Sequence, residues 1–218
     1  ATAAVSEAMR LAETAARPVM LADAQDNPGA GGTGDTTGVL AALVEAGAQR
    51  AIIGMLWDPE TAMAAHQAGK GAELNVAIGG KYPQLGTGPF QARVKVEALS
   101  DGNFDFTGPM YGGAHANLGQ MAALRILDGN SDVTVVVGSN RTQNADQAIF
   151  THLDIHPPEQ AIVCVKSAVH FLADYEPIAQ TVIFAESPGA NPCQLDRIPF
   201  TRLRNGVRLG PNGPAFAG

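Results

Sequence analysis

Short apolar runs that alternate with helical patterns constrain the fold of this chain most. Residues 18–22 (PVMLA) and 51–56 (AIIGML) are apolar at nearly every position, so both faces of these strands are expected to be buried. Amphipathic or apolar helical patterns follow them, over residues 38–46 and 59–67. A strand–helix–strand–helix order with such strands predicts a parallel sheet that is covered by helices on both faces.

The pattern changes after Gly69. Four segments then alternate apolar and polar side chains between glycine-rich turns, as antiparallel hairpins do: residues 73–78, 89–98, 104–111 and 116–127. Buried strands are expected again over residues 132–137, 161–165 and 180–185, with helices over residues 145–153 and 167–175. The expected fold class is therefore α/β, with a mixed, largely parallel sheet flanked by helices and an antiparallel hairpin insertion in the middle.

We expect a single α/β domain over residues 1–218, with a leading helix at residues 3–16, a core at 17–205 and an irregular tail at 206–218. The net charge of -7, without a lysine or arginine cluster, argues against nucleic acid and membrane surfaces as partners. The two cysteines form no disulfide framework, so a cytoplasmic location is expected. The sequence is also compatible with a homo-oligomer of this chain.

A glycine-rich loop joins the first buried strand to the next helix. Residues 22–37 read ADAQDNPGAGGTGDTT, with four glycines between Gly29 and Gly34 and with Asp35 or Thr36 as the expected N-cap. Helix N-termini expose unpaired N–H groups, and glycines let a ligand approach the main chain. The loop is a candidate cradle for an oxyanion or a phosphate, although a tight turn without a ligand would have a similar pattern.

The loops that follow parallel strands meet at one edge of a sheet, where such folds usually bind ligands. Four loops are expected there: residues 23–37, 57–60, 138–143 and 166–170. Their polar side chains are Asp26, Asn27, Asp35, Asn140, Arg141, Lys166 and His170. These groups could bind a substrate carboxylate or polarise a carbonyl, or they could pair with one another and only steady the loops.

Lys166 and His170 are the candidate catalytic residues. Their spacing of four would place them on one face of the helix expected at residues 167–175, where they could serve as a proton donor and acceptor. The alternative is structural, because Ser167 is an ordinary N-cap and a histidine beside Phe171 is often a hydrogen-bonded core residue.

Other motifs fail on their context. Residues 29–34 match GxGxxG, but six residues separate the strand from this match and Asp35 follows its last glycine, which disfavours a dinucleotide site. The run from His152 to His156 carries three possible metal ligands, but two prolines follow it and no further histidine or cysteine lies nearby in the sequence. No P-loop and no G-x-S-x-G motif is present.

Several segments together resemble the C-terminal domain of the MlrC family of zinc metallohydrolases, named for a microcystin-degradation protein. The resemblance runs collinearly over about residues 17–205 and rests on these segments: DNPG at 26–29, GDTT at 34–37, WDPE at 57–60, GGK at 79–81, RTQ at 141–143, VKSAVHF at 165–171 and YEPIA at 175–179. Ala168 replaces the family's usual second serine, and PGAGGTGD replaces PGGGAPGD in the glycine loop.

This resemblance implies a hydrolase of peptide or other amide bonds whose zinc ligands lie in an N-terminal domain outside this chain. No metal ligand and no cofactor is expected within the chain itself. Its expected partners are that metal-binding domain and a peptide or amide substrate. The resemblance places the following residues toward the substrate: Asp26, Asn27, Gly31, Gly32, Asp35, Lys166 and His170, beside Arg141. The competing hypothesis is a stand-alone anion or small-molecule binding domain that uses the glycine loop.

Overall fold

Five parallel strands form one side of an eight-stranded sheet, with β10 at its edge. The computed structural model describes residues 1–217, and its strand order is β10-β1-β9-β2-β8-β7-β4-β3. The parallel strands are β1 (Val19–Asp23), β2 (Ala51–Trp57), β8 (Val133–Gly138), β9 (Ile162–Val165) and β10 (Thr181–Ala185). All five positions of β1 are buried, as its apolar sequence predicts. The expected mixed, largely parallel sheet is confirmed.

The middle of the chain adds antiparallel strands, which confirms the hairpin insertion. Three of them extend the main sheet: β3 (Glu73–Ile78), β4 (Phe90–Ser100) and β7 (Met121–Ile126). A separate two-stranded sheet pairs β5 (Asn103–Asp105) with β6 (His115–Asn117). The single strand expected at residues 116–127 is thus divided in two, and Gly119, with φ of 65°, turns the chain between the parts.

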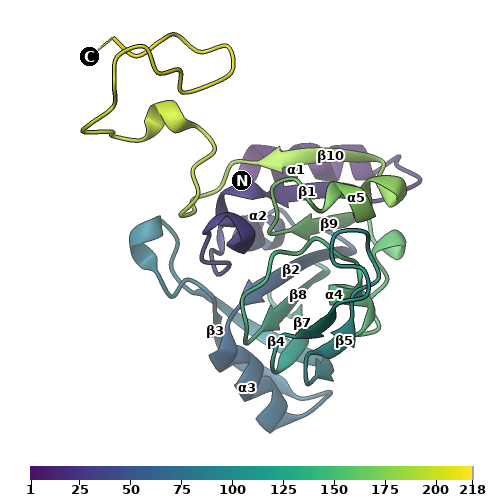
Figure 1. The fold of residues 1–218 in the computed structure, drawn as a ribbon. Helices are drawn as coiled ribbons and strands as arrows, with labels where there is room; N and C mark the ends of the chain where they lie inside the picture. Colours follow the sequence, from purple (N-terminus) through teal and green to yellow (C-terminus); the bar gives the residue numbers. More distant parts are fainter. Residues whose placement is uncertain (218) are drawn as a thin grey trace.

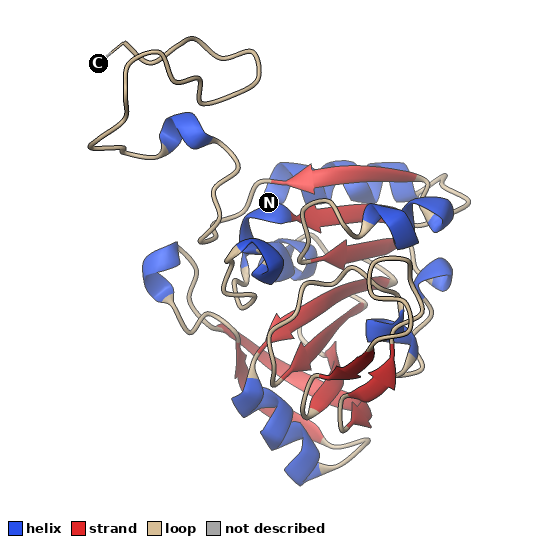
Figure 2. Cartoon of the chain, in the orientation of Figure 1, coloured by secondary structure: helices blue, strands red, loops and turns tan. Residues whose placement is uncertain are grey.

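Helices cover both faces of the sheet (Figures 1 and 2). The α-helices are α1 (Thr2–Ala12), α2 (Gly38–Glu45), α3 (Pro59–Ala68), α4 (Ala148–Thr151) and α5 (Leu172–Tyr175). Short 3-10 turns lie at Ala24–Asp26, Pro28–Ala30, Pro83–Leu85, Pro157–Glu159, Glu176–Ile178 and Leu195–Arg197. Alternate residues of β1 enter two separate apolar clusters: Val19 and Leu21 face α1 and α2, whereas Met20 and Ala22 face the α4 and α5 side.

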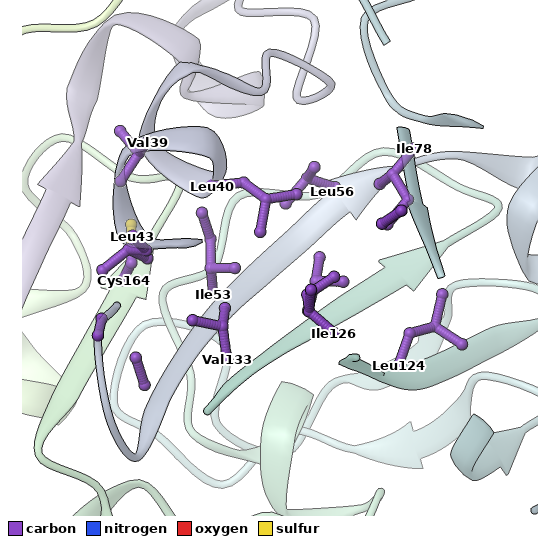
Figure 3. Close-up of a cluster of buried hydrophobic side chains, with 14 of the residues drawn as sticks. Val39, Leu40, Leu43, Ile53, Leu56, Ile78, Leu124, Ile126, Val133 and Cys164 are labelled. Atoms are coloured by element: carbon purple, nitrogen blue, oxygen red, sulfur yellow. The ribbon is translucent and has the colours of Figure 1, made fainter. Parts of the chain in front are cut away.

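The larger cluster joins α2 to the sheet (Figure 3). Leu40 and Leu43 of α2 lie against Ile53 and Leu56 of β2, and all four side chains are fully buried. Truncating one of these leucines to alanine is expected to cost about 2–5 kcal/mol of folding free energy. This packing fixes the start of α2, and therefore the end of the glycine loop, relative to the sheet.

Several expected helices are shorter than their patterns indicate. The leading helix ends at Ala12 rather than at residue 16, and α4 covers only residues 148–151 of the expected 145–153. The helix expected over residues 167–175 is wrong for its first half, because only Leu172–Tyr175 is helical. The expected cap of α3 is confirmed, since Asp58 accepts a hydrogen bond from the backbone N–H of Thr61 at 3.1 Å.

After β10 the chain is irregular, as its proline and glycine content predicts. A short 3-10 turn and an isolated bridge between Arg208 and Ala215 are the regular features there up to residue 217. Figure 1 shows this tail extending away from the sheet. Within residues 1–217, no helix has the length and apolar character needed to cross a membrane.

Candidate functional site

The four expected loops do meet at the carboxyl edge of the parallel strands. The backbone N–H of Trp57 donates to the carbonyl of Gly34 at 2.8 Å, which ties the end of β2 to the glycine loop. The N–H of Asp58 donates to the carbonyl of Gly138 at 3.0 Å, and the Trp57 indole donates to the carbonyl of Ser139 at 2.9 Å. These bonds hold the loops after β1, β2 and β8 together.

Lys166 lies beneath this edge and is fully buried. Its Nζ donates to Asp23 Oδ2, Asp26 Oδ2 and the carbonyl of Thr36, each at 2.8 Å, so all three ammonium hydrogens have acceptors. Burial opposes the charge, but the two carboxylates outweigh it and raise the pKa of Lys166 above its ordinary value. The structure therefore places Lys166 in a structural ion cluster instead of on a cleft surface.

Asp26 is the centre of the glycine loop. Its Oδ1 accepts hydrogen bonds from the Gly34 N–H at 2.8 Å and the Thr33 hydroxyl at 3.1 Å. Its Oδ2 accepts from the N–H and the hydroxyl of Thr36, at 2.8 and 2.9 Å. Burial raises the pKa of Asp26, but Lys166 and the bonds from Thr36 outweigh it, so the net pKa lies below its ordinary value.

The loop thus binds an anion that belongs to the chain itself. Asn27 accepts two further loop hydrogen bonds. Its side-chain Oδ1 accepts from the Gly29 N–H at 2.9 Å, and its backbone carbonyl accepts from the Gly32 N–H at 2.8 Å. Gly32 is buried, and a Cβ there would lie 2.6 Å from the backbone carbon of Asp26, whereas Gly31 is exposed with φ of 92°. Asn27 and Gly32 are therefore parts of the loop's internal framework.

Asp23 shares Lys166 but is otherwise unsupported. Its Oδ1 has no hydrogen-bond partner within residues 1–217, and the side chain is fully buried. Burial raises the pKa of Asp23, and the attraction of Lys166 offsets this only in part. Two carboxylates and one ammonium leave this cluster one negative charge in excess, which makes Lys166 essential to its stability.

Asp35 does not cap α2, because the helix begins after Thr37. The buried Asp35 carboxylate accepts from the backbone N–H of Lys81 at 2.5 Å, and its carbonyl accepts from the Gly80 N–H at 2.7 Å. Asp58 Oδ2 accepts from the Gly79 N–H at 2.8 Å. The expectation of an Asp35 or Thr36 N-cap is wrong because Asp35 instead holds the turn that precedes Tyr82.

Arg141 is exposed on this edge and is held by an aromatic pair. Its guanidinium carbon lies 3.5 Å from the centre of the Trp57 ring and 5.8 Å from that of Tyr82. Its Nε donates to the carbonyl of Thr33 at 2.8 Å, and Nη2 donates to the Tyr82 hydroxyl at 3.1 Å. The neighbouring Asn140 is also exposed and donates to the carbonyl of Asn117 at 3.1 Å.

His170 is exposed, and its Nδ1 lies 3.4 Å from Gln143 Oε1. Gln143 in turn packs beside the glycine loop, because a Cβ on Gly29 would lie 2.7 Å from the Gln143 side chain. Since residues 166–171 are not helical, His170 does not share a helix face with the buried Lys166. The shared helix face expected from their spacing is therefore wrong.

With this geometry established, the sequence model of the MlrC C-terminus matches residues 21–202. This chain belongs to the MlrC C-terminal family. It is 27% identical over 172 residues to Microcystinase C of Sphingomonas sp, and the match covers 79% of the chain and 32% of the relative. This chain is also similar to a crystal structure from Mesorhizobium sp. BNC1 that is provisionally named a metallopeptidase. The two share 26% sequence identity with a TM-score of 0.78, and the match covers 92% of this chain and 39% of the crystallised chain.

The relatives are therefore much longer than this MlrC C-terminal chain, which spans 32% of one and 39% of the other. Their names raise the question of a metal. Residues 1–217 contain no group of three histidine, cysteine, aspartate or glutamate side chains placed to hold one. Asp23 and Asp26 are already paired with Lys166, and His152 is stacked on Phe104 with a centroid distance of 4.1 Å. The described residues therefore contain no complete three-ligand metal site of their own.

The sequence did not indicate the roles of three residues at this edge of the sheet: Asp23, Thr36, which accepts a hydrogen bond from Lys166, and Tyr82. Asp23 had a usable signal, because it ends the buried strand β1 and Lys166 directly follows the neighbouring strand β9. Tyr82 follows the glycine pair of a distant hairpin. Its approach to Arg141 depends on the turn that Asp35 holds, which no local pattern indicates.

Proposed function

We propose that this chain is the substrate-orienting C-terminal domain of a longer zinc-dependent hydrolase that cleaves peptide or other amide bonds. The observation that carries this proposal is the edge at the ends of the parallel strands, where buried ion pairs fix the loops and leave Arg141 and His170 exposed. The length and the hydrolase-type names of the relatives support it. The zinc ligands would then lie outside residues 1–217.

In this proposal the chain contributes position rather than a reacting group. Lys166 and Asp26 hold the glycine loop, and the loop holds Arg141 through the carbonyl of Thr33 at 2.8 Å. A substrate that contacts Arg141 or His170 would therefore meet groups already fixed before binding, which reduces the entropy lost when it is oriented. The exposed Gly31 allows a substrate to approach the loop closely.

The glycine-loop alternative has less support. A stand-alone anion site would need free backbone N–H groups, but the N–H groups of Gly29, Gly32, Gly34 and Thr36 already donate within the loop. Asp26 also places a negative charge where a phosphate would have to bind. We therefore assign the loop a supporting role in the proposed domain.

The test is to express the complete reading frame that encodes this chain and to measure amide hydrolysis and zinc content. We expect activity and bound zinc in the complete product. In it, Arg141→Gln should raise KM at unchanged zinc content, whereas Arg10→Gln, which removes an exposed arginine on α1, should leave both unchanged. Stoichiometric zinc bound by residues 1–218 alone, or a complete product without hydrolytic activity, would refute the division of labour.

A further inference from the structure

Arg141 has hydrogen-bonding capacity that the fold does not use. A guanidinium carries five N–H donors, and the described contacts of Arg141 use two, to the carbonyl of Thr33 and to the Tyr82 hydroxyl. No carboxylate within residues 1–217 lies at ion-pair distance from it.

The free donors of Arg141 are also held in a fixed plane. Its guanidinium stacks 3.5 Å from the Trp57 ring centre, and the Trp57 indole is itself bonded to Ser139 of the same loop. Tyr82 stacks on Trp57 with centroids 6.3 Å apart and also accepts a bond from Arg141. An exposed arginine normally loses side-chain entropy when it binds a ligand, and this arrangement removes most of that cost beforehand.

We infer that Arg141 is a carboxylate receptor, and that the amide substrates of this domain carry a free carboxylate that its guanidinium binds. A planar fork of N–H donors matches a carboxylate in a charge-assisted, two-point contact. The local site is needed because the whole chain has a net charge of -7 and would otherwise repel an anionic substrate. The substrate class rests on the proposed function, whereas the carboxylate site itself can be tested without it.

The chain offers a built-in probe, because Trp57 is its single tryptophan. We would titrate the full chain with N-acetylglycine, with its neutral amide and with sodium chloride, and follow Trp57 fluorescence and the NMR signal of its indole N–H. We expect a saturable response to N-acetylglycine and none to its neutral amide or to sodium chloride. The response to inorganic phosphate should be weaker than that to N-acetylglycine, and a stronger response to phosphate would overturn the carboxylate class.

Arg141→Gln should weaken N-acetylglycine binding at least tenfold, and Arg141→Lys should weaken it severalfold because an ammonium lacks the planar fork. Arg10→Gln is the matched control and should bind as the unchanged chain does. If Arg141 only links the loops, both Arg141 variants would lower the melting temperature, and the unchanged chain would give no saturable response. Either an equal response to the neutral amide or full binding by Arg141→Gln would also overturn the inference.

These outcomes separate the inference from the proposed function. A complete product that hydrolyses amides while the chain ignores N-acetylglycine would refute the carboxylate receptor and leave the proposed function intact. Specific carboxylate binding by the chain together with an inactive complete product would refute the hydrolase role and keep the receptor. In an active complete product, an Arg141→Gln variant that loses equal activity on acidic and neutral amide substrates would refute the substrate class.

Discussion

Replacing Lys166 with methionine should strongly destabilise this domain. Methionine keeps the length of the side chain but removes the ammonium that donates to Asp23, Asp26 and Thr36. All three residues that accept these bonds are buried, so water cannot take over the lost bonds. The perturbation therefore isolates the energetic role of one buried charge.

The size of the effect follows from what each partner retains. The Asp26 carboxylate keeps its hydrogen bonds from Gly34, Thr33 and Thr36, so its charge remains stabilised by the loop. Asp23 keeps no hydrogen bond among the described residues, because its Oδ1 already lacks a partner. One uncompensated buried carboxylate costs about 3–5 kcal/mol. For a chain of this size, a loss of about 3–5 kcal/mol lowers the melting temperature by about 6–20 °C.

Urea unfolding followed by far-UV circular dichroism measures this loss directly. The double variant Asp23→Asn with Lys166→Met should recover a large part of it, because the uncompensated charge is then absent. Burial already raises the pKa of Asp23, so the proton binds more tightly to the folded than to the unfolded chain. The cost of the single variant should therefore shrink as the pH falls through the folded-state pKa, which lies above 3.8. A loss below about 1 kcal/mol at neutral pH would refute the reasoning.

Three further outcomes follow from other parts of the structure. Gly80→Ala should lower the free energy of unfolding, measured in urea, by about 2–4 kcal/mol, because φ is 60° and the added methyl would lie 2.2 Å from the backbone of Gly88. The control Gly71→Ala also has a positive φ but has open space around the methyl, so it should cost only about 1–2 kcal/mol. In a thiol-reagent titration the exposed Cys193 should react in the native state, whereas Cys164 should react only after unfolding, because it is buried where the reagent cannot reach it. Burial also lowers the pKa of His152, so stability should fall as the pH drops below 6.5, and His152→Phe should remove that component of a pH–stability profile.

The fold could be predicted from the sequence because its signals are local. Continuous apolar runs such as residues 51–56 identify buried strands, and the glycine-punctuated alternation after Gly69 identifies the hairpins. Helix ends were less predictable. Residues 167–171 have a helical pattern, but Lys166 is held under the sheet edge and the chain becomes helical only at Leu172.

The candidate site was predictable as a set of loops but not as a set of roles. Parallel topology places Asp26, Arg141 and Lys166 at one edge, which the strand pattern alone implies. Which of them is exposed depends on side-chain contacts between segments more than a hundred residues apart, such as Lys166 with Asp26. A residue type cannot indicate this, because lysine and arginine are both ordinarily surface residues.

The position of β1 between β9 and β10 has a consequence for the synthesis of the chain. Val19 pairs with Ile162 on one side and with Thr181 on the other, so β1 has neither neighbouring strand until residues 162–165 have left the ribosome. Until then, α1 and α2 can cover the face with Val19 and Leu21, but both hydrogen-bonding edges of β1 and the carboxylate of Asp23 have no native partners. The edge that carries the candidate site is therefore assembled last, and nascent chains that end before residue 160 should depend on chaperones.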